Sequence, residues 1–110
     1  MNDLVKKRCT PCEGGTTPLQ REKSEAYLGQ LNGWRLTDHG DGIERTFEFK
    51  NFHQTMAFVN AVAWIAHTQD HHPELAVSYR QCQVHYTTHA INGLSENDFI
   101  CAAQIEALLT

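Results

Sequence analysis

Residues 67–98 read HTQDHHPELAVSYRQCQVHYTTHAINGLSEND, and they contain two runs with the pattern of neighbouring strands. Apolar side chains alternate with polar ones over residues 75–79 and again over residues 82–86, which is the pattern of half-buried strands. Only Arg80-Gln81 lies between the two runs. The sequence therefore predicts a strand pair with a tight connection or a bulge between its members.

A long apolar segment precedes this strand pair. Asn51 is a suitable N-cap, and apolar side chains recur at helical spacing over residues 52–66. Pro73 disfavours helical geometry at His72, so the helix should end near His67. Because this is the most apolar segment of the chain, we expect it to be the central helix packed on the sheet.

Similar signals on both sides complete the order of elements. Thr17 as N-cap, followed by Pro18, opens a helix that should end at Gly33. Residues 34–37 and 43–49 then read as an antiparallel hairpin, and Ser95 caps a last helix that runs to about residue 109. The sequence therefore predicts an α+β fold in the order α-β-β-α-β-β-α, with a four-stranded antiparallel sheet and three helices packed on one face.

The first residues show no periodicity. We expect residues 1–16 to be a flexible N-terminal arm and residues 17–110 to form a single domain. The arm contains Cys9-Thr-Pro-Cys12, but a zinc site needs two further ligands at matched spacing, and no strand precedes the pair as in a thioredoxin-like motif. Together with Cys82 and Cys101, these cysteines are expected to be reduced thiols.

Composition limits the partners. The chain has 110 residues, nine Lys and Arg, and a formal charge of −4, so it lacks the basic face that nucleic-acid binding requires. No apolar run approaches the roughly 18 residues of a membrane span, and residues 1–10 lack the apolar core of a secretory signal. We expect a cytoplasmic protein that binds neither nucleic acid nor membranes.

Four histidines of residues 67–98 suggest proton-transfer chemistry: His67, His71, His72 and His89. An imidazole, with an ordinary pKa of about 6.5, both gives and takes protons near neutrality. The loop before the third strand and the end of the fourth can approach each other in space. His71, His72 and His89 would then line one cavity at the rim of the sheet.

A metal site is the alternative use of the same side chains. His67 and His71 have the i, i+4 spacing of a helical zinc site, but the helix should be ending there and no Glu follows His67. His71, His72 and His89 remain a possible three-histidine set.

Other polar residues have ordinary structural explanations. His39, His53 and His85 are expected to be solvated surface residues. Asp98 is an acid at the third position of a helix, which stabilises the helix whatever the function. Tyr79 fits core filling as well as ligand contact.

The spaced pattern resembles the pterin-4a-carbinolamine dehydratase family. The pattern admits His67, where many members have Glu, and the stretch from Thr88-His89 to Gly93-Leu-Ser-Glu96 is similar as well. Trp34 and residues 45–52 resemble the family's first hairpin, so that the resemblance covers about residues 17–108. The matching positions are His67, His71, His72, Pro73, Tyr79, His89 and Asp98.

The resemblance implies a hydro-lyase that removes water from a 4a-hydroxytetrahydropterin to give quinonoid dihydropterin in tetrahydrobiopterin recycling, without metal or redox cofactor. It implies that His71 and His89 are acid–base groups, while His72 acts with them by binding and orienting the pterin. It also implies a homodimer or homotetramer, or in the alternative a regulatory module that binds a protein partner. Further substrate-binding roles fall to Pro73 and Thr88, and supporting roles to His67, Tyr79 and Asp98.

Overall fold

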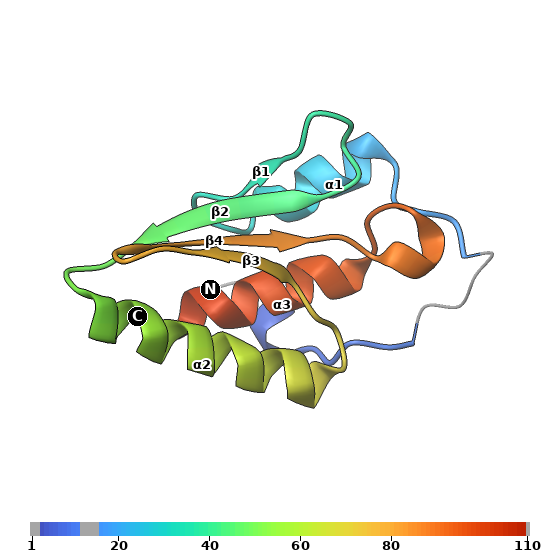
Figure 1. The fold of residues 1–110 in the computed structure, drawn as a ribbon. Coiled ribbons are helices and arrows are strands. Elements are labelled where there is room, and N and C mark those ends of the chain that lie inside the picture. Colours follow the sequence, from blue (N-terminus) through green and yellow to red (C-terminus); the bar gives the residue numbers. More distant parts are fainter. Residues whose placement is uncertain (1–2, 12–15, 110) are drawn as a thin grey trace.

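A computed structural model describes residues 3–11 and 16–109 of the chain. It shows the predicted α+β fold, with its four-stranded antiparallel sheet in the order β1-β2-β4-β3 (Figure 1). Two short 3₁₀ turns, η1 and η2, add to the predicted elements. The elements are η1 (Leu4–Lys6), α1 (Arg21–Leu28), β1 (Arg35–Leu36), β2 (Ile43–Glu48), α2 (Phe52–Gln69), β3 (Glu74–Val77), β4 (Gln81–Tyr86), η2 (His89–Ile91) and α3 (Glu96–Ala107).

The two central strands give the sheet one apolar and one polar face. On β4, Cys82, Val84 and Tyr86 are buried, whereas the alternate residues are more exposed. Strand β2 pairs with β4 in antiparallel register, with Ile43 opposite Tyr86. This alternation is the one that the sequence predicted, and it leaves a single face of the sheet for helices to cover.

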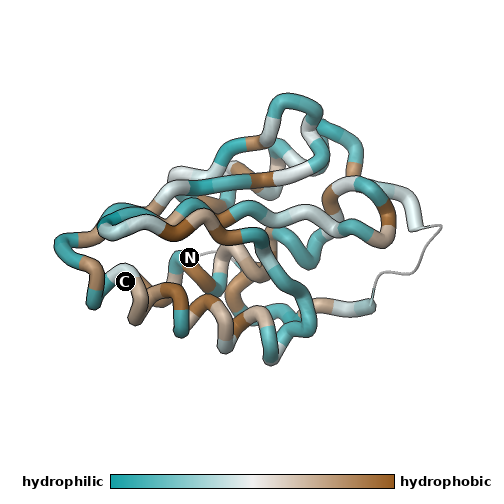
Figure 2. Tube along the Cα trace, viewed as in Figure 1, coloured by the Kyte–Doolittle hydropathy of each residue, from teal (hydrophilic) through white to brown (hydrophobic). Residues whose placement is uncertain are grey.

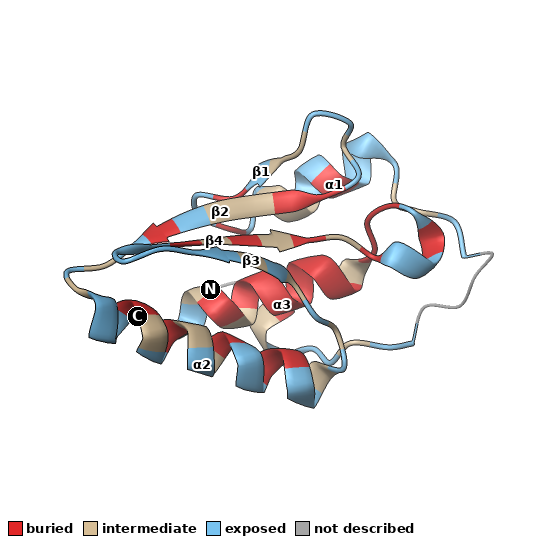
Figure 3. Ribbon diagram, viewed as in Figure 1, coloured by how far each residue is buried: buried red, intermediate tan, exposed pale blue. Residues whose placement is uncertain are grey.

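Helix α3, and not α2, is the most deeply buried helix. Most of its side chains are buried, whereas α2 buries a stripe and exposes Trp64 by 66% (Figure 3). Apolar residues are frequent along both helices (Figure 2). Helix α2 packs on the sheet through β4, as expected, but it is not the central, most buried helix. Overall apolarity does not reveal that α3 is also covered by other segments. Helix α1 packs on α3 through the stacked rings of Tyr27 and Phe99.

Two of the three expected helix caps are confirmed. The Asn51 side chain accepts a hydrogen bond from the Gln54 backbone N–H, and Ser95 forms a capping box with Asp98. The cap at Thr17 was wrong, since α1 begins only at Arg21. The chain before α1 is held in extended form, and its Leu19 N–H donates to the carbonyl oxygen of Leu94.

Strands β3 and β4 form the predicted pair, joined by a tight turn. The backbone N–H of Ser78 donates to the carbonyl oxygen of Gln81, so that Tyr79 and Arg80 occupy the turn. The turn is tied to the beginning of α2, because Thr55 donates its hydroxyl to the carbonyl oxygen of Tyr79.

The N-terminal segment, residues 3–11, differs from the loose arm that we expected for residues 1–16. Leu4 is buried in the hydrophobic core, and η1 packs against α3. The sequence shows no periodicity here because one short turn buries only one apolar side chain. Cys12 lies outside the described residues, and among those described Cys9, Cys82 and Cys101 are free thiols. No helix in the described ranges is long and apolar enough to cross a membrane.

Candidate active site

A left-handed turn delivers His71 to the interior. Helix α2 ends at Gln69, and Asp70 takes a positive φ of 51°, which Asp tolerates better than most residues. The backbone N–H of His71 then donates to the carbonyl oxygen of Ala66. The chain is thereby reversed from the end of α2 into the beginning of β3.

His71 meets a buried carboxylate at the beginning of α3. Its Nε2 lies 2.6 Å from Oδ1 of Asp98, whose side chain is 0% exposed. The other oxygen of Asp98, Oδ2, accepts hydrogen bonds from the Thr88 hydroxyl at 2.8 Å and from the Ser95 backbone N–H at 3.0 Å. All of these groups are therefore fixed by the α3 N-terminus and the end of β4.

The environment of His71 favours its protonated form. Burial acts to lower the pKa of His71, but the hydrogen bond and negative charge of Asp98 outweigh it, so that the pKa is raised above its ordinary value. The ring also stacks on Tyr86, with centroids 5.3 Å apart. This packing fixes the plane of the imidazole ring.

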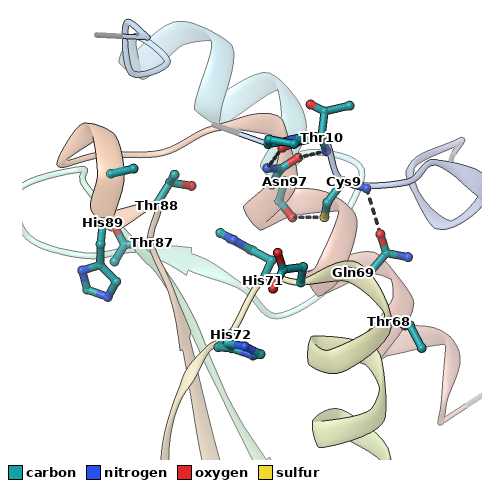
Figure 4. A pocket seen from close by; sticks show the side chains of 13 residues that line it. Cys9, Thr10, Thr68, Gln69, His71, His72, Thr87, Thr88, His89 and Asn97 are labelled. Carbon is teal, nitrogen blue, oxygen red and sulfur yellow. Dashed lines mark hydrogen bonds between the residues drawn. The ribbon is translucent and has the colours of Figure 1, made fainter. Parts of the chain in front are cut away.

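His71 forms part of the wall of a pocket of about 570 Å³, a size typical of small-molecule sites. His72 and His89 line the same pocket and are both exposed, with His89 on the far side of it from the end of α2 (Figure 4). The pocket is thus bounded by the end of α2, the beginning of β3, η2 and the N-terminal segment. Its lining residues outside the N-terminal segment are Thr68, Gln69, Asp70, His71, His72, Thr87, Thr88, His89, Ala90 and Asn97.

The structure does not bring every predicted site residue to this pocket. Tyr79 stacks on Phe52 at the other end of α2, and an 18-residue helix separates the two ends by on the order of 25 Å. His67 is exposed on α2 and contacts Trp64. Pro73 follows His72 directly but is not among the lining residues, and Asp98 lies behind His71.

Several lining residues escaped the sequence analysis. Gln69, Asp70 and Asn97 lie within two residues of predicted site residues, so their positions carried the only available signal. Cys9, Thr10 and Pro11 come from the N-terminal segment, for which no pattern indicated a fixed position.

The metal site that we considered as an alternative would need a group of ligand side chains. Among residues 3–11 and 16–109, no three His, Cys, Asp or Glu side chains are grouped so that they could hold a metal ion. The Nε2 atom of His71 is engaged by Asp98.

The structure is thus an α+β layer protein whose sheet has, at its rim, a pocket lined by three histidines, side chains of the kind that can serve as general acids and bases. The family model for pterin 4 alpha carbinolamine dehydratase matches residues 17–108. The chain therefore belongs to this family, and it is a hydro-lyase.

Similar proteins support the assignment over nearly the whole chain. A protein of Nitrosomonas eutropha is 61% identical over 97% of this chain and 94% of its own length, and one of Nitrosospira multiformis is 57% identical over 98% and 94%. Both are named provisionally as pterin-4-alpha-carbinolamine dehydratases. The crystal structure of a transcriptional coactivator/pterin dehydratase from Brucella melitensis has a TM-score of 0.82 at 32% identity, covering 86% of this chain and all of that one.

Proposed function

We propose that the pocket binds a 4a-hydroxytetrahydropterin and eliminates water from it to give quinonoid dihydropterin. The observation that carries this proposal is that His71, His72 and His89 line one pocket while a buried Asp98 holds His71. Family membership supplies the substrate class, and the pocket supplies the groups that the reaction needs.

The chemistry requires two proton transfers. Hydroxide is a poor leaving group, so the 4a-oxygen takes a proton as the C–O bond breaks, and the proton on N5 is lost to a base. A positioned acid and base typically accelerate such a step by about 10²–10⁴-fold. These two proton transfers account for the elimination of water, so the reaction needs neither an electron carrier nor a Lewis acid.

The surroundings of the histidines favour His71 as the acid. Asp98 raises the pKa of His71 and so favours the protonated ring, while its contact with Nε2 leaves Nδ1 as the nitrogen that exchanges protons. His89, across the pocket, then serves as the base that takes the N5 proton. His72 binds and orients the pterin together with Thr88, while Pro73 restricts the backbone at His72.

The decisive experiment is the dehydration rate of a 4a-hydroxytetrahydropterin with and without a chelator. We expect activity that the chelator does not change and that falls about 10²–10⁴-fold in His71→Ala and His89→Ala. His53→Ala, at an exposed position near the beginning of α2, is the matched control. Activity that the chelator removes would instead support a metal enzyme, and full activity in both pocket variants would refute the proposed roles.

We further propose that the protein is a cytoplasmic homodimer or homotetramer that supports tetrahydrobiopterin recycling. Large apolar side chains on α2 and the β3–β4 hairpin are exposed, which supports an association surface on this side of the molecule. The exposed apolar side chains are Phe52, Trp64, Val77 and Tyr79. We expect Trp64→Glu to reduce the mass measured by light scattering, and Asn60→Glu on the same helix to leave it unchanged.

A regulatory protein-binding role is the second candidate. The Brucella melitensis relative carries both descriptions, coactivator and pterin dehydratase, in its name. This role would be favoured over dehydration if the protein lacked dehydratase activity and bound a different protein through Trp64.

A further inference from the structure

The N-terminal segment, residues 3–11, is anchored to α3 at several points. Leu4 is 2% exposed and belongs to the hydrophobic core. Lys7 forms an ion pair of 2.8 Å with Glu96, and its carbonyl oxygen accepts a hydrogen bond from the side chain of Gln104. These contacts fix the path of the chain towards the pocket.

The anchoring continues at the pocket itself. The side-chain amide of Asn97 holds the backbone of Thr10 on both sides, because Oδ1 accepts from the Thr10 N–H at 3.0 Å and Nδ2 donates to its carbonyl oxygen at 2.6 Å. The Cys9 N–H donates to Oε1 of Gln69 at 2.8 Å. The segment is thereby joined to the end of α2 and to the beginning of α3, the two elements that position His71.

Cys9 contributes a neutral side chain to this arrangement. Its sulfur lies 3.6 Å from the sulfur of Cys101 and 3.6 Å from the carbonyl oxygen of Asn97. The hydrogen bond with Cys101, and then burial, raise the pKa of the Cys9 thiol well above its usual range. Cys9 therefore remains a packed thiol near neutral pH and not a nucleophile.

From these contacts we infer that Cys9, Thr10 and Pro11 form a wall of the substrate site and contact a part of the pterin that does not react. All three residues line the pocket beside His71, as Figure 4 shows for Cys9 and Thr10. The family match begins only at residue 17, so this wall lies outside the matched region. The inference rests on the proposed function, since the reacting C4a–N5 edge must face the histidines.

A wall of this kind binds the substrate and the transition state equally. Its loss raises KM and leaves kcat nearly unchanged, which distinguishes it from loss of an acid–base group. The first test places a larger side chain on the wall, so that it takes up space in the pocket. We expect Thr10→Trp to raise KM about tenfold with kcat within about twofold. Thr17→Trp, at an exposed position that does not line the pocket, should change neither.

The second test releases the wall without changing a lining residue. Leu4→Asn removes the buried anchor, and Lys6→Asn introduces the same residue at an exposed position two residues on. Both are made in a Cys12→Ser background, in which reaction of Cys101 with a thiol reagent reports release, since Cys101 is 0% exposed beneath Cys9. We expect faster labelling and a raised KM in Leu4→Asn only.

The outcomes separate the two proposals. Unchanged KM in Thr10→Trp, or in a Leu4→Asn protein whose Cys101 has become reactive, overturns the wall while the wild-type activity stands. If Leu4→Asn does not expose Cys101, the Thr10→Trp result alone decides. A wild-type protein that neither dehydrates the substrate nor binds a fully oxidised pterin, followed by pterin fluorescence, overturns the proposed function and the wall together.

Discussion

The imidazole of His71 and the carboxylate of Asp98 are joined by a 2.6 Å contact between Nε2 and Oδ1. The same carboxylate caps α3 through its second oxygen, which accepts the Ser95 N–H. One buried side chain therefore stabilises the helix and orients the histidine, with one oxygen for each task. Substitution at Asp98 should accordingly affect both the chemistry and the stability.

Asp98→Asn removes the negative charge and keeps the shape of the side chain. The pKa of His71 is raised by this charge, so it should fall in the variant and move the corresponding limb of the pH profile of kcat/KM to lower pH. We expect kcat near pH 7 to fall at least about tenfold, because less His71 carries a proton. An unshifted pH profile would show that Asp98 does not control the titration of His71.

Stability should depend on pH through the same pair. The folded protein binds the His71 proton more tightly than the unfolded chain, since the folded pKa is raised. The contribution is therefore fully present below about pH 6.5 and is lost as pH rises through the folded pKa. We expect the difference in unfolding free energy between wild type and His71→Gln to decrease from pH 5.5 to 8.5 in urea titrations.

The matched background for this measurement is Asp98→Asn. There the pH dependence of the effect of His71→Gln should largely vanish, because the charge that raises the pKa of His71 is absent. A dependence that is equally steep in both backgrounds would assign the effect to another group.

Thr88→Val tests the second oxygen of Asp98. The Thr88 hydroxyl donates to Oδ2 at 2.8 Å and lies 2.8 Å from the Ser95 hydroxyl, and all three side chains are buried. Valine leaves the carboxylate short of a donor, which should cost about 1–3 kcal/mol of unfolding free energy. Thr46→Val, at an exposed position of β2, should stay within about 0.5 kcal/mol. Equal stability of the two variants would contradict the importance of this network.

The sheet and the helix order were predictable from local patterns. Alternation over β4 and the caps at Asn51 and Ser95 are signals between neighbouring residues, and the structure confirms them. The start of α1 was not predictable in this way, because a long-range hydrogen bond from Leu19 to Leu94 holds the chain before it extended.

The candidate site was predictable where it is made of histidines. The spacing of His71, His72 and His89 anticipated a shared pocket, and their catalytic roles remain predictions. The contribution of residues 9–11 was invisible, because it depends on the burial of the single side chain of Leu4 and on amide contacts from Asn97. Tyr79 was associated with the pocket by family pattern, although it lies at the opposite end of α2.

Gly93→Ala tests the packing that places the loop after β4. A Cβ at this position would lie 2.7 Å from Cβ of Pro18, closer than any ordinary contact, and Gly93 also bridges Thr88 through backbone hydrogen bonds. The chain around Pro18 or Thr88 must shift, at a cost of about 1–3 kcal/mol of unfolding free energy. Gly29→Ala is the matched control, because its Cβ would meet the carbonyl oxygen of Ala26 only at 3.3 Å and its φ of −61° suits alanine. We expect thermal and urea unfolding to show a loss of stability for Gly93→Ala alone. Its activity should also fall, because Thr88 adjoins His89. Equal stability of both variants would show that the loop adjusts to the added Cβ without cost.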